Sequence, residues 1–316
     1  MAQPKVYVTR RVPAEGLELL KKSCNVFVWD SDDVVPRATL LEKVAGMDGL
    51  FCTISDIIDK DVLEAAGHSL KVIGTMSVGM AHIDTRECAK RGIEVANTPD
   101  VASDSAAELT VALLLLTTRR LVEGVEAVKA GEWSLWRPMW LLGVESVNRT
   151  LGIVGMGRVG FGVARRMKPF GVGRIIYHDE YQPGYAADVG AELVDLDTLL
   201  SESDILCICC ALTPRSRNMF NASTFAKMKK SAILINTARG AIVNHDELAK
   251  ALAQGDIAAA GLDVTEPEPL PTDHPLMSLD NCIILPHLGT NSKETRINMA
   301  TNTAMNITSV LCCGQA

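Results

Sequence analysis

Short apolar runs of strand length recur along the chain, and each is separated from the next by a stretch long enough to hold a helix. In the first hundred residues the runs are KVYVT, VFVWD, GLFCTI and KVIGTM; after residue 150 they are LGIVG, RIIYHD, DILCICC, AILINT, AAGLDV and CIILPH. Parallel strands need long crossover connections of this kind. The pattern predicts an α/β protein with mainly parallel sheets.

A different kind of segment, from about residue 100 to 149, lies between these two groups of runs. It opens with DVASDSAAELTVALLLLTTRR, where Ser103 or Asp104 could cap a helix that carries Ala and Leu on nearly every face. A helix that is apolar all round is buried, so we expect this one between domains or in a subunit interface. Three of the four tryptophans follow it, and packing between domains or subunits is their first explanation: Trp133, Trp136 and Trp140.

The stretch LGIVGMGRVGFG places three glycines in the pattern G-x-G-x-x-G, after an apolar run and before the helix-like FGVARRMKPFG. Gly155 permits a tight turn, Gly157 lets the backbone approach a pyrophosphate, and Gly160 lets the helix pack closely on the strand. The start of the following helix offers free N–H groups to the same anion. The sequence therefore predicts a dinucleotide site.

An acidic pair follows the next strand. Asp179 and Glu180 stand about 20 residues after Gly160, the distance at which a carboxylate meets the adenosine ribose. Because carboxylates repel a 2′-phosphate, the pair favours NAD(H) over NADP(H). His178 stands just ahead of the pair, and the sequence leaves open whether His178 or Asp179 contacts the ribose.

Charged side chains also stand at the carboxyl ends of three later runs, where open α/β sheets bind ligands. Arg239 follows AILINT, Asp263 ends AAGLD with Glu268 shortly after it, and His287 ends CIILPH. Each has an ordinary explanation alone, such as a surface arginine or a histidine that caps a strand. Together they fit the reduction of a 2-keto acid: Arg239 holds the carboxylate, His287 supplies a proton, and Glu268 stabilises the protonated imidazole.

Composition excludes several classes of protein. The 316 residues are 47% hydrophobic and carry a net charge of -7 with no long run of either sign, which argues against a nucleic-acid partner or a polybasic membrane surface. No apolar stretch reaches the roughly 18 to 20 residues of a membrane helix, and MAQPKVYVTR lacks the features of a secretory signal. We expect a soluble, cytoplasmic protein of two domains.

Several of the nine cysteines lie inside apolar runs, among them Cys52, Cys207, Cys209 and Cys282. We expect buried, reduced thiols and no metal site. The last four residues, 313 to 316, superficially fit a prenylation box, but Gly314 and Gln315 are not aliphatic.

The motifs LGIVGMGRVG, INTARGAIVN, AAGLDVTEPEPLPTDHPL and ILPHLGTNS, in this order and at this spacing, resemble those of the D-2-hydroxyacid dehydrogenase family over nearly the whole chain. VYVTRRVPAEGLELL, VWDSDD, MSVGMAHID, TPDV and WSLWRPMWL are similar to its animal branch of glyoxylate and hydroxypyruvate reductases. The resemblance implies NAD(P)H-dependent reduction of hydroxypyruvate to D-glycerate and of glyoxylate to glycolate. It also implies Arg239 on the substrate carboxylate, His287 as acid and base, and Glu268 as its partner.

The resemblance further implies a Rossmann-type parallel-sheet cofactor domain, residues 102–289, inserted into a flavodoxin-like substrate domain of residues 1–101 and 290–316. Backbone N–H groups around Val78 and Gly79 would complete the carboxylate site. A homodimer would form through residues 102–149, from which Trp136 can reach the substrate pocket of the partner. The implied cofactor contacts, besides the three glycines, are Arg158, Val159, His178, Asp179, Thr237, Asp263 and Gly289.

One departure from the family concerns the coenzyme. Animal enzymes of this type that prefer NADP(H) carry a basic residue just after the second cofactor strand, whereas this chain has Asp179, Glu180 and Tyr181 there. The departure puts a preference for NADP(H) in doubt and leaves the reaction unchanged.

Several alternatives remain open at this stage. A phosphoglycerate dehydrogenase is less expected because the chain stops soon after the closing helix, and formate dehydrogenase needs no acid at the position of His287. C-terminal-binding-protein corepressors share the fold and the charged trio, but they carry a longer disordered tail. A dinucleotide sensor with a vestigial trio is the other non-enzymatic alternative, and turnover would distinguish it.

Overall fold

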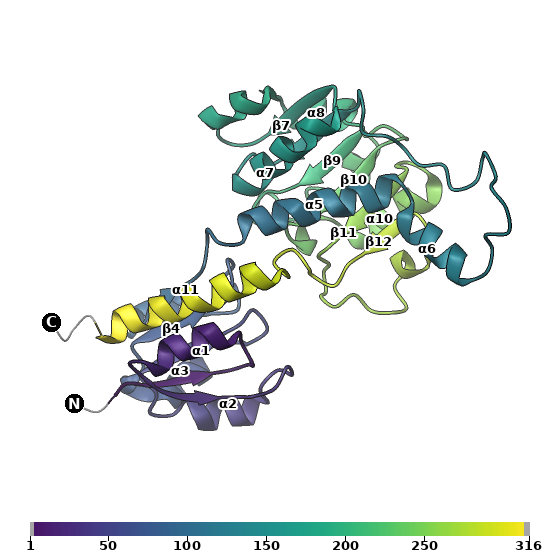
Figure 1. Ribbon diagram of the computed structural model, residues 1–316. Helices are drawn as coiled ribbons and strands as arrows, with labels where there is room; N and C mark the ends of the chain where they lie inside the picture. The colour runs from purple at the N-terminus through teal and green to yellow at the C-terminus, as the bar shows by residue number, and fades with distance from the viewer. Residues whose placement is uncertain (1–2, 313–316) are drawn as a thin grey trace. The chain divides into compact units, whose positions relative to one another are not determined.

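The computed structural model describes residues 3–312, so the rejected prenylation box at residues 313 to 316 lies outside the described part. The chain divides into two compact units (Figure 1), one made of Met1–Ala102 with Asn291–Ala316 and the other of Ser103–Thr290. Each unit has its own parallel sheet with helices on both faces.

The first unit contains a five-stranded sheet in the order β2-β1-β3-β4-β5. Its strands are β1 (Lys5–Val8), β2 (Asn25–Val28), β3 (Gly49–Cys52), β4 (Val72–Thr75) and β5 (Glu94–Ala96). Its helices are α1 (Ala14–Lys21), α2 (Arg37–Val44), α3 (Lys60–Ala66), α4 (Thr85–Lys90) and α11 (Lys293–Cys312). Helices α2, α3 and α4 contribute to the core on one face of the sheet, and α1 and α11 to the core on the other.

Small residues let α11 return to this unit and lie beside α1 (Figure 1). A Cβ atom on Gly16 of α1 would be 2.9 Å from the Cβ of Ala300, and one on Gly74 of β4 would be 2.7 Å from Cγ1 of Ile307. The absent side chains allow α11 to pack directly on α1 and on the sheet.

The second unit contains a seven-stranded sheet in the order β12-β11-β10-β9-β6-β7-β8. Its strands are β6 (Thr150–Val154), β7 (Arg174–His178), β8 (Ala191–Leu193), β9 (Ile205–Ile208), β10 (Ile233–Asn236), β11 (Ala259–Leu262) and β12 (Cys282–Ile284). Its helices are α5 (Ser103–Thr118), α6 (Leu121–Lys129), α7 (Arg158–Met167), α8 (Leu196–Glu202), α9 (Ala222–Phe225) and α10 (His245–Gln254). Because the strand order reverses between β6 and β9, the carboxyl edge there is a topological switch point, where such sheets bind ligands.

The predicted α/β class with parallel sheets is confirmed, and each of the ten apolar runs contains a strand. Two further strands, β5 and β8, have only three residues each and lie at sheet edges. Half-exposed edge strands need no apolar run, and this is why the hydrophobic pattern did not predict them.

Helix α5 is buried within the second unit, where it packs on α7, β10 and β11. Its burial therefore does not depend on a position between domains. Asp104 does not cap it, because this residue lies inside the first turn and its Oδ1 accepts hydrogen bonds from Arg166 (2.9 Å) and Arg165 (3.3 Å).

Eight cysteines of the described part are free thiols. Cys52 and Cys207 are buried as expected, and burial raises the pKa of the Cys207 thiol to about 12. Cys209 and Cys282 are half-buried as whole residues, and burial nonetheless raises the pKa of both thiols. Residues 3–312 contain no helix long and apolar enough to span a bilayer and no acid, histidine or cysteine cluster suited to a metal ion.

Candidate active site

The charged residues predicted from the sequence follow three adjacent strands of the second unit. Arg239 comes three residues after β10, Asp263 directly after β11 and His287 three residues after β12. Since β10, β11 and β12 are neighbours and parallel, their carboxyl ends meet at one edge of the sheet.

Asp263 organises the backbone that carries His287. It is almost fully buried; its Oδ1 accepts the N–H of Leu288 at 2.7 Å and its Oδ2 the N–H of Gly289 at 2.8 Å. The N–H of His287 donates to the Asp263 carbonyl at 3.0 Å. Burial raises the pKa of the Asp263 carboxyl, and the two N–H donors only partly offset that effect.

These three hydrogen bonds hold His287 in the left-handed region, with a φ of 57°. Such a conformation costs about 1 to 3 kcal/mol in a residue other than glycine and persists only where the surroundings enforce it. The structure thus fixes the direction of the imidazole through the backbone as well as through its side-chain partner.

That partner is Glu268, whose Oε1 lies 2.5 Å from Nδ1 of His287. The pKa of Glu268 is below its ordinary value: burial raises it, but the hydrogen bond and charge of His287, the N–H of Thr265 and the charge of Arg239 together outweigh burial. An ionised carboxylate at Nδ1 stabilises the protonated imidazole and leaves the other ring nitrogen, Nε2, for a ligand. Nε2 makes no hydrogen bond to any residue from 3 to 312.

Arg239 is exposed and is held mainly through its backbone. The side chain of the fully buried Asn236 donates to the Arg239 carbonyl at 3.0 Å and accepts from the N–H of Ala238 at 3.0 Å. Of the guanidinium nitrogens, Nη1 donates to the Ala238 carbonyl at 2.6 Å, while Nε and Nη2 find no acceptor in the described part of the chain. Two donors of the planar fork are thus available to an anion.

The glycine loop has the shape that the sequence predicted. Gly155 has a φ of 91°, and a Cβ there would be 2.6 Å from Cα of Cys210; a Cβ on Gly160 would be 2.1 Å from the carbonyl oxygen of Gly155. A Cβ on Gly157 would meet no protein atom within 4 Å. Two glycines therefore serve close packing, and the third borders open space in which a pyrophosphate fits.

Helix α7 starts at Arg158, earlier than the expected FGVARRMKPFG segment, with Gly157 as its N-cap. Arg158 and Val159 therefore form its first turn, the part of a helix whose N–H groups point toward an anion bound there. The residues present fit a dinucleotide. Gly157, where an added Cβ would meet open space, caps a ten-residue helix at the carboxyl end of β6.

The two candidate ribose contacts, Asp179 and His178, already make hydrogen bonds within the protein. Asp179 accepts the N–H of Met156 in the glycine loop at 2.7 Å through Oδ2, and more weakly that of Tyr181 at 3.3 Å through Oδ1. Glu180 pairs with Arg215 at 2.7 Å. His178 donates from Nδ1 to the Val194 carbonyl at 3.1 Å, because a carbonyl can only accept.

Thr237 is tied to helix α5. The hydroxyl of Thr110 donates to the Ala106 carbonyl at 2.7 Å, so the 2.6 Å contact between the two threonines requires Thr237 to donate to Thr110. No pattern in the sequence signalled this bond, because it joins residues far apart in the chain.

The remaining candidates belong to other surfaces. Val78 and Gly79 lie in the first unit, in the turn that follows β4. Trp136 lies in the segment after α6 and is 80% exposed; Trp140 is half-buried, with the Arg137 guanidinium 3.9 Å from its ring centroid.

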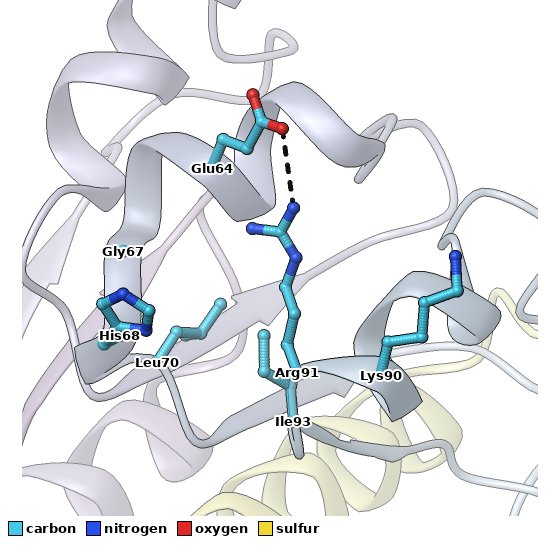
Figure 2. Close-up of a pocket in the computed structure, with 7 residues that line it drawn as sticks. All are labelled: Glu64, Gly67, His68, Leu70, Lys90, Arg91 and Ile93. Carbon is cyan, nitrogen blue, oxygen red and sulfur yellow. Dashed lines mark ion pairs between the residues drawn. The ribbon is translucent and has the colours of Figure 1, made fainter.

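A hollow of about 540 Å³ on the first unit contains none of the predicted residues (Figure 2). Its charged groups pair with acids: Arg91 lies 3.6 Å from Glu64 and donates to Glu87 at 3.0 Å, and Lys90 lies 2.9 Å from Glu87. Cations that are already paired make a poor site for a substrate carboxylate.

Comparison with known proteins agrees with this geometry. The NAD-binding domain of D-isomer specific 2-hydroxyacid dehydrogenases matches residues 111–289. A glyoxylate reductase/hydroxypyruvate reductase of Homo sapiens is 51% identical over 306 residues, which are 96% of this chain and 93% of that protein. The chain belongs to the D-2-hydroxyacid dehydrogenase family. The resemblance inferred from the motifs is thereby confirmed.

Solved structures of relatives extend the match to both units. The TT0316 protein of Thermus thermophilus superposes with a TM-score of 0.92 at 41% identity, covering 97% of this chain and 96% of that one. An NADPH-dependent glyoxylate/hydroxypyruvate reductase of Sinorhizobium meliloti, solved with NADP and malonate, superposes with a TM-score of 0.84 at 28% identity, covering 100% of this chain and 96% of that one.

Proposed function

We propose that the protein is an NAD(P)H-dependent reductase that converts hydroxypyruvate to D-glycerate and glyoxylate to glycolate. The observation that carries the proposal is the 2.5 Å contact between His287 and Glu268 beside the two unpaired donors of Arg239. The names of the relatives, which refer to glyoxylate and hydroxypyruvate, support this pair of substrates.

Each residue of the trio has one role in this proposal. Arg239 binds the substrate carboxylate through Nε and Nη2, which orients the neighbouring carbonyl. His287 holds a proton at Nε2 and gives it to the carbonyl oxygen as negative charge develops there. Glu268 keeps the imidazole protonated and correctly oriented, and Asp263 fixes the backbone of residues 287–289.

The coenzyme would be held by the loop from Gly155 to Gly160, the first turn of α7 and the segment from His178 to Asp179. When bound, the reduced nicotinamide supplies the hydride. We propose that NADH is preferred, because Asp179 and Glu180 follow β7, the strand after which a 2′-phosphate would be recognised, and a carboxylate there would repel it. Thr237, Asp263 and Gly289 border the same site in this proposal.

The two units would have different roles. The second unit, with its glycine loop and charged trio, would be the cofactor domain, and the first unit the substrate-binding domain. Backbone N–H groups of Val78 and Gly79 in the first unit would supply further donors to the substrate carboxylate. The free thiols are those of a protein in a reducing compartment, so we assign it to the cytoplasm.

We also propose a homodimer formed through the segment from α6 to residue 147. Large apolar side chains are exposed along it: Leu121, Val122, Val125, Val128, Trp133, Leu135, Trp136, Met139, Leu142 and Val147. A surface this apolar is typical of an interface, and a second copy is the partner that the resemblance implies. Trp136 would reach the substrate pocket of the partner subunit.

The test is NADH and NADPH oxidation at 340 nm, with hydroxypyruvate and glyoxylate as substrates in all four combinations. We expect turnover of both acids and faster turnover with NADH. Protein that is folded and binds dinucleotide but oxidises neither coenzyme would contradict the reductase and favour a dinucleotide sensor or corepressor.

A further inference from the structure

The turn after β4 has a feature that the proposed function does not use. Its three consecutive carbonyl groups, at residues 77 to 79, all accept hydrogen bonds. The Ser77 carbonyl accepts hydrogen bonds from the N–H of Thr98 at 3.0 Å and from its hydroxyl at 3.3 Å. The Val78 carbonyl accepts a hydrogen bond from Nδ2 of Asn97 at 2.7 Å. The Gly79 carbonyl accepts one from the Ser77 hydroxyl at 2.7 Å.

The N–H groups of the same turn are in the opposite state. Those of Val78 and Gly79 find no acceptor among residues 3–312. Val78 is exposed and Gly79 is half-buried, so solvent or a ligand reaches this part of the turn. A peptide plane whose oxygen is held by the protein presents its N–H on the other side, and successive planes of this kind form an anion-binding concavity.

We propose that Asn97 is a positioning residue, which holds the Val78 carbonyl so that the N–H of Gly79, on the same peptide plane, stays directed at the substrate carboxylate beside the N–H of Val78. This inference rests on the proposed function, since it assumes a carboxylate ligand at the turn. The side chain of Asn97 does not touch the reacting atoms.

The hydrogen-bond directions behind Ser77 follow from counting protons. Ser77 gives its single hydroxyl proton to the Gly79 carbonyl, so in the 2.8 Å contact between Thr75 and Ser77 the donor is Thr75. Thr75 has then used its own proton, and its 3.0 Å contact with His82 requires Nε2 of His82 to donate. Burial lowers the pKa of His82, although Asp56 opposes the shift. The chain thus runs from His82 through Thr75 and Ser77 to the Gly79 carbonyl, which shares its peptide plane with the N–H of Met80 and not with those of Val78 and Gly79.

Asn97 is anchored independently of that chain. Its own carbonyl accepts from Nδ2 of Asn306 on α11 at 3.1 Å, while its side chain reaches Val78. The residue therefore bridges the turn and α11, two elements of the same unit that are distant in sequence. Because Asn97 is only half-buried, its replacement leaves no large cavity.

The test compares Asn97→Ala and Asn97→Asp with a control, Asn302→Ala. Asn302 is another asparagine whose Nδ2 donates to a carbonyl, that of Asn298 at 2.7 Å, on the exposed side of α11. The Asp variant keeps the size of the side chain and replaces the donor with a carboxylate. The measurements are kcat and KM for hydroxypyruvate, the Kd for NADH and the melting temperature.

We expect KM to rise roughly 3- to 10-fold in Asn97→Ala, the value of one hydrogen bond, and further in Asn97→Asp. The kcat and the Kd for NADH should stay within about twofold of wild type, because the turn acts on carboxylate binding alone. Asn302→Ala should change nothing.

Two results would overturn the inference while the wild type turns over. One is an unchanged KM in Asn97→Ala; the other is a parallel loss of kcat, NADH affinity and melting temperature, which indicates a merely structural role. If the wild-type protein itself fails to reduce either acid, the proposed function fails and this inference fails with it.

Discussion

Glu268 is the residue whose charge most directly affects His287. Its folded pKa is below the ordinary value, so the fold favours the ionised carboxylate. The sign follows from linkage: this carboxylate contributes stability at pH values above its unfolded pKa, and the contribution is lost as the pH falls through the lower folded pKa. At neutral pH the acid is therefore charged and able to stabilise an imidazolium.

Replacing Glu268 with glutamine should shift the pH profile of reduction. The neutral amide no longer favours the protonated imidazole, so the alkaline limb of kcat/KM for glyoxylate should move to lower pH, with roughly a 10-fold or greater loss at pH 7. Rates measured between about pH 5 and 9 check this. Glu266→Gln, on the same turn, is the control and should keep the wild-type profile; a wild-type profile in Glu268→Gln would refute the pairing.

Arg239→Ala should raise KM for hydroxypyruvate roughly 100-fold, about 3 kcal/mol, and also lower kcat, because the guanidinium holds the carboxylate in both the ground state and the transition state. Arg239→Lys keeps the charge but loses the planar guanidinium, so its KM should fall between those of the wild type and of Arg239→Ala. Steady-state kinetics of the three proteins decide the matter. An unchanged KM in Arg239→Ala would show that the clamp lies elsewhere.

Sequence reasoning grouped Arg239, Asp263, Glu268 and His287 because each follows an apolar run, and parallel strands bring such positions to one edge. It did not predict that Asp263 binds the N–H groups of residues 288 and 289, since that depends on the positive φ of His287. It also missed Asn236, although an asparagine that ends the apolar run AILIN was a usable signal.

At the scale of elements, two glycines of the glycine loop have different roles: Gly160 allows close packing, and Gly157 leaves space for a ligand. A Cβ at position 160 would be 2.1 Å from the Gly155 carbonyl oxygen, whereas one at position 157 would meet no protein atom within 4 Å. The two glycines lie in the same turn, so they form a matched pair of substitutions.

Gly160→Ala should lower the free energy of unfolding by about 2 to 4 kcal/mol, because the helix must move away from the strand. Gly157→Ala should melt like the wild type but bind NADH at least about 10-fold more weakly, because its methyl group takes the space of the pyrophosphate. Thermal melts and fluorescence titrations with NADH measure both effects. Normal NADH binding by Gly157→Ala would place the pyrophosphate elsewhere.

The hydrophobic pattern predicted every strand that lies in an apolar run, including β2 and β12, which are at sheet edges and are not fully buried. All ten apolar runs hold strands, and the three-residue edge strands β5 and β8 were missed because neither contains an apolar run. The start of α7 was also missed, since its first turn, Arg158 to Gly160, has the composition of a loop.

At the scale of the whole molecule, the open question is what covers the apolar segment that follows α5. Trp136 and Met139 are 80% and 78% exposed in the single chain. We expect light scattering to give a mass about twice the 34.0 kDa of one chain. The double variant Val125→Glu with Met139→Glu should give a monomer, and Ile57→Glu, an exposed residue of the other unit, should stay dimeric. A monomeric wild type would contradict the assigned interface.

The central claim is that His287 gives a proton to a keto acid reduced by NADH, and His287→Asn tests it most directly. Asparagine tolerates the left-handed backbone of this position but does not titrate near neutral pH. The measurement is kcat for hydroxypyruvate at pH 7, beside the Kd for NADH. We predict that the wild type turns over and that the variant loses at least about 100-fold in kcat with NADH binding unchanged. A variant kcat within about threefold of wild type would contradict the account.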